Sequence, residues 1–177
     1  MARIALPTRE SLADDEARSR WDRQAARGAV LNIQRAFMTN PAINLNALQV
    51  WRASGLEPRA RELVILRAAF DKKSTYEWHQ HVRIARGEGL TDADINAVTD
   101  WEGSDRFSAD ERALLAYVDD LAGGGRPSDE TFKAVSSGRD AGAVFGVTFL
   151  ITLNFQLAQI MATLDLETED PFVGWKL

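Results

Sequence analysis

The 177-residue chain contains no cysteine and only two histidines. Without cysteine, these residues form no disulfides, thiolate metal sites or iron–sulfur clusters, and they carry out no thiol redox catalysis. The 21 basic and 26 acidic side chains give a net charge of −5, and the sequence has no basic cluster. Nucleic-acid binding depends on neutralising phosphates, so we expect no nucleic-acid partner.

Long apolar runs are scarce. Residues 1–21 contain no apolar stretch of the kind that a secretory signal needs, so we expect a cytoplasmic location. Only Ala141–Leu164 lacks charge over the roughly 20 residues that cross a membrane, but polar side chains interrupt it and acidic residues follow it. We expect a core helix here and no membrane contact, with a membrane span as the alternative.

Sequence patterning predicts an all-α protein. Glycine and proline fall between the periodic apolar segments, as is typical of helix boundaries, and no segment alternates with a period of two. Hydroxyl residues followed by acidic ones mark helix starts at Thr91, Ser108 and Ser128. We predict a single domain over residues 1–177, made of an N-terminal helical extension (1–40) and a core (41–177). The expected helices are 9–26, 29–39, 42–54, 58–71, 74–87, 92–101, 109–122, 129–137 and 141–165.

Both histidines lie in the segment STYEWHQH of residues 74–81. If this segment is helical, Glu77 and His81 are one turn apart on the same face, inside the arc that carries the apolar residues. Imidazole has an unperturbed pKa near neutrality, and a carboxylate beside it suits proton transfer near pH 7. His79 points to the opposite side, where we expect it at the surface or in a subunit contact.

A second inward-facing acid lies in the preceding predicted helix. Glu62 falls between Leu66 and Ala69 on the helical wheel, and a tight turn brings it near Glu77 and His81. Buried ionisable groups are costly unless they are paired, so a cluster of three shares this cost through shifted pKa values. We predict three catalytic residues: His81 as general acid/base, Glu77 holding its tautomer and Glu62 relaying the proton. Two alternatives stay open, a purely structural polar network and a divalent metal site, although a second inward histidine is missing.

Four further side chains are predicted to contact a small-molecule substrate: Ser74, Trp78, Asn154 and Arg67. Arg67, or else Arg59 or an arginine from a neighbouring subunit, would bind a substrate carboxylate. For Trp78 the alternative is core packing, and for Asn154 a hydrogen bond between helices. Tyr76 falls on the outward side of its predicted helix, where an aromatic ring suits an oligomer contact.

Three segments resemble the core of the carboxymuconolactone decarboxylase family. They are RELVILR at 61–67, YEWHQH at 76–81 and GLTDADI at 89–95, in matching order and spacing. The resemblance spans about residues 45–100, and residues 149–166 show a weaker similarity to the same family. It implies an alkylhydroperoxidase D-like helical bundle that assembles as a homo-oligomer, a trimer or a hexamer.

The resemblance also implies the chemistry. The peroxidase branch of this fold uses a Cys-x-x-Cys pair between a glutamate and a histidine. The glutamate and histidine positions hold Glu62 and His81, but the cysteine positions hold Ser74 and Glu77, so we expect no thiol peroxidase activity. The decarboxylase branch uses no metal or organic cofactor and keeps a pair like Glu77 and His81. We therefore expect cofactor-free lyase or isomerase chemistry on a small organic acid or lactone. The alternative is a non-catalytic helical oligomer that binds or scaffolds.

Overall fold

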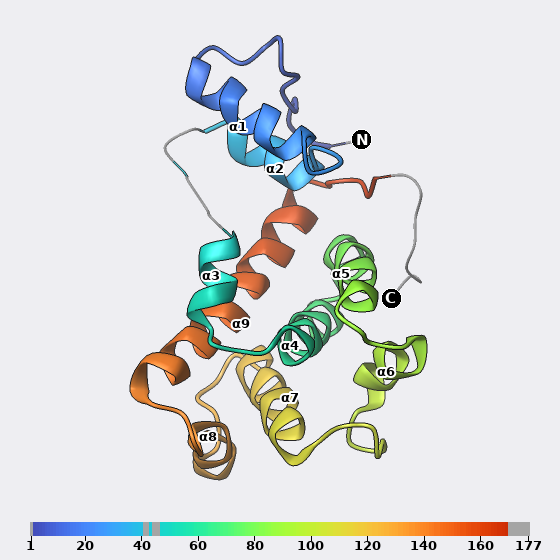
Figure 1. Cartoon of the computed structure of the whole chain (residues 1–177), viewed down its shortest axis with the longest axis vertical. Helices are drawn as coiled ribbons and strands as arrows, with labels where there is room; N and C mark the ends of the chain where they lie inside the picture. Colours follow the sequence, from blue (N-terminus) through green and yellow to red (C-terminus); the bar gives the residue numbers. More distant parts are fainter. Residues whose placement is uncertain (1, 41–42, 44–46, 170–177) are drawn as a thin grey trace.

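The computed structural model describes residues 2–40, 43 and 47–169, which form helices and no β-strand (Figure 1). The all-α prediction is confirmed for this part of the chain. A short 3₁₀ turn, Val98–Asp100, follows α6. The helices are α1 (Asp15–Ala25), α2 (Asn32–Met38), α3 (Ala47–Ala53), α4 (Pro58–Asp71), α5 (Thr75–Gly87), α6 (Asp92–Ala97), α7 (Ala109–Ala122), α8 (Asp129–Ser136) and α9 (Ala141–Thr163).

Capping side chains set most helix starts at the predicted places. Thr91 and Ser108 each accept a hydrogen bond from the backbone N–H three residues later, and each closes a capping box. The first helix begins later than predicted, at residue 15, because the Asp14 side chain accepts from the Ala17 N–H at 2.7 Å and residues 8–11 form a turn. The predicted helix 92–101 is shorter because it tightens into the 3₁₀ turn. Part of the predicted start of helix 42–54 lies outside the described residues.

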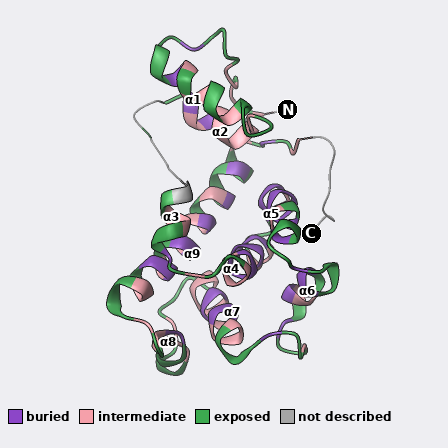
Figure 2. Cartoon of the chain, viewed as in Figure 1, coloured by how far each residue is buried: buried purple, intermediate pink, exposed green. Residues whose placement is uncertain are grey.

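The central helix, α4, is buried on nearly all sides (Figure 2). One face packs with α5, α6 and α7 around Trp78 and Leu115, and another packs with α7 and α9 around Ile65 and Ile151. Fully burying one such aliphatic or aromatic side chain stabilises the fold by about 1.5–3 kcal/mol. The helix is therefore a rigid support for any polar group that it carries inward.

Helix α9 packs along α3 and α4 on one side only. It is the one helix among the described residues whose length and hydropathy would allow it to cross a membrane. Its buried side is in very close contact with α3, because a Cβ atom at Gly146 would lie 2.1 Å from the carbonyl oxygen of Ala53. The opposite side exposes Phe145 and Phe149.

The two N-terminal helices form a unit beside the C-terminal end of α9 (Figure 1). Ala36 of α2 packs against Tyr76 of α5 and Met161 of α9. The prediction that Tyr76 points outward is wrong, since this packing leaves its side chain buried. Its hydroxyl accepts from the Ile33 N–H at 3.2 Å and donates to Glu169 at 2.7 Å. Docking of the extension thus covers a face of α5 that a helical wheel assigns to solvent.

Candidate active site

A tight turn brings α4 and α5 together. Lys73 adopts the left-handed conformation with φ of 53°, and the Ser74 N–H donates to the Ala69 carbonyl at 2.8 Å, which ends α4 in a Schellman-type motif. Ser74 then caps α5, its hydroxyl accepting from the Glu77 N–H at 3.4 Å. This turn sets the inward faces of the two helices against each other.

Across this contact, His81 pairs with Glu62. The distance from His81 Nδ1 to Glu62 Oε2 is 2.7 Å, and the Glu62 side chain is fully buried. An ionised carboxylate at this distance accepts a hydrogen bond from Nδ1–H, so the neutral ring has its lone pair on Nε2. The pair therefore fixes both the tautomer and the orientation of the imidazole.

The second oxygen of Glu62 accepts from Arg61 Nε at 2.9 Å. Burial by itself would raise the pKa of Glu62, but its interactions with His81 and Arg61 outweigh burial and hold that pKa below its usual range. The Arg61 guanidinium also lies 4.9 Å from the centroid of the Trp51 ring. Glu62 is thus an ionised carboxylate with both oxygens occupied.

Glu77 is in the opposite electrostatic situation. It is buried, its Oε2 atom has no hydrogen-bond partner within the described residues, and burial raises its pKa well above the usual range. Burial therefore favours the protonated, uncharged form of Glu77. The prediction that Glu77 holds the tautomer of His81 is wrong, because Glu62 occupies the ring nitrogen from across the helix contact.

Glu77 and His81 line a cleft of about 820 Å³, a volume typical of small-molecule sites. Side chains of α1, α2, α3, α5 and α9 form its walls. Trp51 of α3 packs edge-on to the His81 ring with 5.9 Å between centroids. The cleft therefore combines one oriented imidazole, one neutral carboxylic acid and a largely apolar lining.

The sequence over residues 41–120 matches the carboxymuconolactone decarboxylase family. The matched segment covers less than half of the 177 residues and contains the motifs around Glu62 and His81. The family segment supplies Glu62, Glu77, His81 and Trp51, whereas the walls from α1, α2 and α9 lie outside it. No protein with a curated description matches the chain significantly in sequence.

Solved structures share the fold. An uncharacterized peroxidase-related protein from Ralstonia eutropha JMP134, described as an alkylhydroperoxidase AhpD core, has a TM-score of 0.76 at 19% identity, with 97% of this chain and 94% of that one covered. A peroxidase-related protein from Silicibacter sp. TM1040 gives 0.76 at 14% identity, with 97% and 93% covered. A protein of unknown function from Agrobacterium tumefaciens, provisionally named an AhpD antioxidant defence protein, gives 0.64 at 24% identity, with 69% and 85% covered. These similarities establish an AhpD-like fold, and the 177 residues hold no thiol.

Of the other residues predicted to contact substrate, some line the cleft and some do not. Asn154 lines the cleft, and its Nδ2 donates to the Leu150 carbonyl of its own helix at 2.8 Å, not to another helix. Ser74 serves as the cap of α5 and Trp78 lies in the hydrophobic core, so neither lines the cleft. His79, predicted at the surface or in a subunit contact, is buried within the described structure of the single chain.

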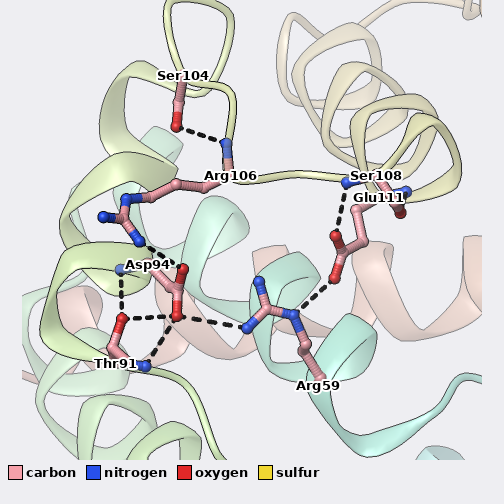
Figure 3. Close-up of polar contacts among 7 residues, drawn as sticks. All are labelled: Arg59, Thr91, Asp94, Ser104, Arg106, Ser108 and Glu111. Carbon is pink, nitrogen blue, oxygen red and sulfur yellow. Dashed lines mark hydrogen bonds and ion pairs between the residues drawn. The ribbon is translucent and has the colours of Figure 1, made fainter.

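Arg67 and Arg59 are also placed away from the cleft. Arg67 binds both oxygens of Asp119, at 2.5 and 3.0 Å. Arg59 binds Glu111 at 2.8 Å and Asp94 at 3.4 Å in a network that joins α4, α6 and α7 (Figure 3). Burial alone would raise the pKa of Asp94, but hydrogen bonds from Thr91, Arg106 and Arg59 lower it to about 2. Arg67 and Arg59 therefore join helices to one another and do not face the cleft.

The described residues contain no cluster of three histidine, aspartate or glutamate side chains arranged to hold a metal ion. Glu62, Glu77 and His81 accordingly do not meet around a common point. The alternative of a metal site built from these three residues finds no support in their geometry.

Cleft residues that the sequence analysis missed come from two places. Gln80 and Trp51 lie within or near the recognised motifs, whereas the arginines come from the N-terminal extension. A signal for the arginines was present, because they recur at intervals of three and four residues, two on the predicted helix 9–26 and one just past its end. The missed arginines are Arg20, Arg23 and Arg27.

Proposed function

We propose that the chain is a cofactor-independent enzyme that performs acid–base chemistry on a small organic acid or lactone, as a decarboxylase-like lyase or an isomerase. The observation that carries the proposal is the 2.7 Å contact between His81 Nδ1 and the buried Glu62 carboxylate, beside the unpartnered carboxyl group of Glu77. The surroundings lower the pKa of Glu62 and raise that of Glu77, and such a divergence between neighbouring carboxyl groups is typical of acid–base sites. The family match supports the same chemistry.

In this proposal His81 acts as the base. Its Nε2 atom removes a proton from carbon or oxygen of the bound molecule, and the Glu62 carboxylate stabilises the imidazolium that forms. Arg61 in turn keeps Glu62 ionised and in place. Such proton transfer contributes about 10²–10⁴-fold to a rate.

Glu77 acts as the acid. When a carbon–carbon bond to a carboxylate breaks, carbon dioxide leaves and the electron pair stays on carbon, where an adjacent carbonyl or double bond delocalises it. The neutral Glu77 carboxyl group then donates its proton to that carbon, and the resulting carboxylate recovers a proton from the imidazolium or from water. In an isomerisation the same two groups move a proton between two carbons.

Solvent-deuterium incorporation tests this function without knowledge of the natural substrate. Small lactones and keto acids are incubated with the protein in D₂O, and NMR follows exchange of C–H protons next to the carbonyl. We expect catalysed exchange that falls about 10²–10⁴-fold in His81→Ala. Arg83→Gln is a matched control, because Arg83 is an exposed α5 residue that does not line the cleft. Equal exchange in wild type and His81→Ala would reject the function.

The alternative function is non-catalytic binding or scaffolding. Against it stands the unpartnered Glu77 carboxyl group, since an unsatisfied buried polar group costs about 1–3 kcal/mol that a scaffold has no reason to retain. A scaffold would lose no exchange activity on Glu77→Gln, and only its thermal stability would change.

We also propose that the chain assembles as a homo-oligomer, a trimer or a hexamer. Phe145 and Phe149 of α9 are 70% and 46% exposed and stack with ring centroids 6.2 Å apart. Contiguous exposed apolar side chains of this kind mark interfaces. Analytical ultracentrifugation of the Phe145→Asp, Phe149→Asp variant should give the 19.6 kDa mass of one chain, against a multiple for the wild type. A monomeric wild type would contradict the proposal.

A further inference from the structure

The cleft has a cationic wall that the acid–base chemistry does not use. Arg20 and Arg23 of α1, and Arg27 just beyond its end, all line the cleft. Their spacing of three and four residues places them along one side of the helix. We use the term arginine wall for these three residues.

The arginine wall is only partly neutralised. Arg20 pairs with Glu16 at 3.1 Å, and Arg23 donates to the Ser19 hydroxyl at 2.6 Å. Within residues 2–40, 43 and 47–169, neither Arg23 nor Arg27 forms an ion pair with a carboxylate. The acids lining the cleft are Glu16 and Glu77, so three arginines face two carboxyl groups, and burial favours the uncharged form of Glu77. A chain with a net charge of −5 thus presents a positive surface inside its cleft.

Beside the arginine wall the lining is apolar. Phe37 of α2 and Leu157 and Met161 of α9 contribute to it, together with Trp51 next to His81. A molecule that is complementary to both the arginine wall and the apolar lining has an anionic group at one end and an apolar body over the imidazole. The volume of about 820 Å³ accommodates such a molecule.

The arginine wall is tied to the helix that carries His81. Arg9 donates two hydrogen bonds, of 2.6 and 2.8 Å, to Asp22 of α1. Gln34 of α2 donates to Gln24 of α1 at 3.2 Å. The α2 helix is in turn joined to α5 through one carboxylate. Glu169 accepts from the Asn32 N–H at 2.5 Å, from the Tyr76 hydroxyl at 2.7 Å and from Gln80 Nε2. The wall and the imidazole therefore keep a fixed spacing.

We infer that Arg23 and Arg27, with Arg20 beside them, bind the carboxylate of an organic acid whose apolar body lies over His81. Guanidinium groups bind carboxylates through paired, charge-assisted hydrogen bonds. The inference rests on the proposed function and deepens it, because it assigns substrate selection to the N-terminal extension, outside the family segment 41–120.

Binding of matched acid and amide probes tests the inference. Calorimetry at low ionic strength compares phenylacetate with neutral phenylacetamide, using the full chain. We expect saturable phenylacetate binding, with phenylacetamide at least about tenfold weaker, since one charge-assisted contact corresponds to about that factor. Arg23→Gln, Arg27→Gln should weaken phenylacetate binding about tenfold and leave phenylacetamide unchanged.

A second double variant controls for bulk charge. Arg83→Gln, Arg126→Gln removes the same charge from exposed positions that do not line the cleft, and should bind phenylacetate like the wild type. Inorganic phosphate should displace phenylacetate only weakly, because it lacks the apolar body. Equal binding of acid and amide, equal losses in both double variants, displacement by phosphate as strong as by a second carboxylate, or no saturable phenylacetate binding at millimolar concentration would each overturn the inference.

His81→Ala separates this inference from the proposed function. The variant should still bind phenylacetate, because the imidazole is not part of the arginine wall. If the arginine variants leave binding unchanged while deuterium exchange still depends on His81, the arginine assignment fails and the function stands. If binding follows the arginines and no exchange occurs, the function fails and the anion site stands.

Discussion

Helix α4 carries two clusters with acidic side chains, one buried and one half-buried, and they differ in access to a ligand. Near its start, Glu62 pairs with His81, whose ring lines the cleft. Near its end, Asp71 lies 3.3 Å from Arg67, which is itself held by Asp119, and this cluster lines no described cleft. Both clusters hold perturbed carboxyl groups, so burial and perturbed pKa alone do not identify a functional site. What distinguishes the first cluster is an open ring nitrogen beside a neutral acid.

The largest expected effect is a contrast in activity between the two clusters. Glu62→Gln removes the charge that stabilises the imidazolium and should lower deuterium exchange by about 10²–10³-fold. Asp71→Asn should leave exchange unchanged, because its cluster contacts no bound molecule. Exchange rates measured on the two purified variants decide this, and a comparable loss in Asp71→Asn would erase the distinction.

The second cluster should instead control stability through pH. Burial, together with the nearby Asp119 carboxylate, raises the pKa of Asp71 from 3.8 to about 7 despite Arg67. The folded state therefore holds a proton that the unfolded state has released. This stabilisation is complete below about pH 4 and is lost as the pH rises through about 7.

Urea unfolding at pH 5 and pH 8 measures this effect. Over that range the free energy of unfolding of the wild type should fall by about 1–2 kcal/mol more than that of Asp71→Asn. This figure takes about 1.4 kcal/mol per pKa unit, reduced by solvent screening and by coupling to Asp119. Identical pH dependence of the two proteins would show that Asp71 does not titrate abnormally.

The architecture of the cleft offers a structural test. A methyl group at position 146 would lie 2.1 Å from the Ala53 carbonyl, so Gly146→Ala must push α3 away from α9. We expect a destabilisation of about 1–3 kcal/mol. The movement also displaces Trp51 from His81, which should reduce exchange while leaving the Asp71 pH effect intact. Gly125→Ala is a control, since a Cβ there meets no atom within 4 Å.

The smallest expected change in stability concerns the free energy that the fold loses by burying the Glu77 carboxyl group. Glu77→Leu removes an unsatisfied buried carboxyl group and should stabilise the fold by about 1 kcal/mol while abolishing exchange. Thermal unfolding beside the exchange assay measures both changes. A destabilised Glu77→Leu variant would mean that Glu77 has a partner in the folded protein.

The sequence was sufficient for the helices and for part of the site. Caps at Thr91 and Ser108 located helix starts, and acids inside apolar arcs located Glu62 and Glu77. Periodicity assigns a residue to a face but gives no distance across two helices, which is why the partner of His81 was assigned to Glu77.

Two other misses, Tyr76 and the arginines, share a different physical cause, the long-range packing of the N-terminal extension. Tyr76 faces solvent on an isolated helix, but α2 and Glu169 cover that side of α5. The arginine wall depends on the same packing, because α1 faces the cleft only when α2 docks on α5 and α9. Contacts between residues so distant in sequence leave no local pattern.

The central claim is that Glu62 holds the neutral His81 ring with its proton on Nδ1 and a free Nε2. Nitrogen-15 NMR of the labelled protein above neutral pH tests it directly, since the two ring nitrogens have distinct shifts when one is protonated. We predict that His81 shows a protonated Nδ1 and an unprotonated Nε2, and that Glu62→Gln abolishes this preference. A proton on Nε2 of His81 in the wild type would contradict the account.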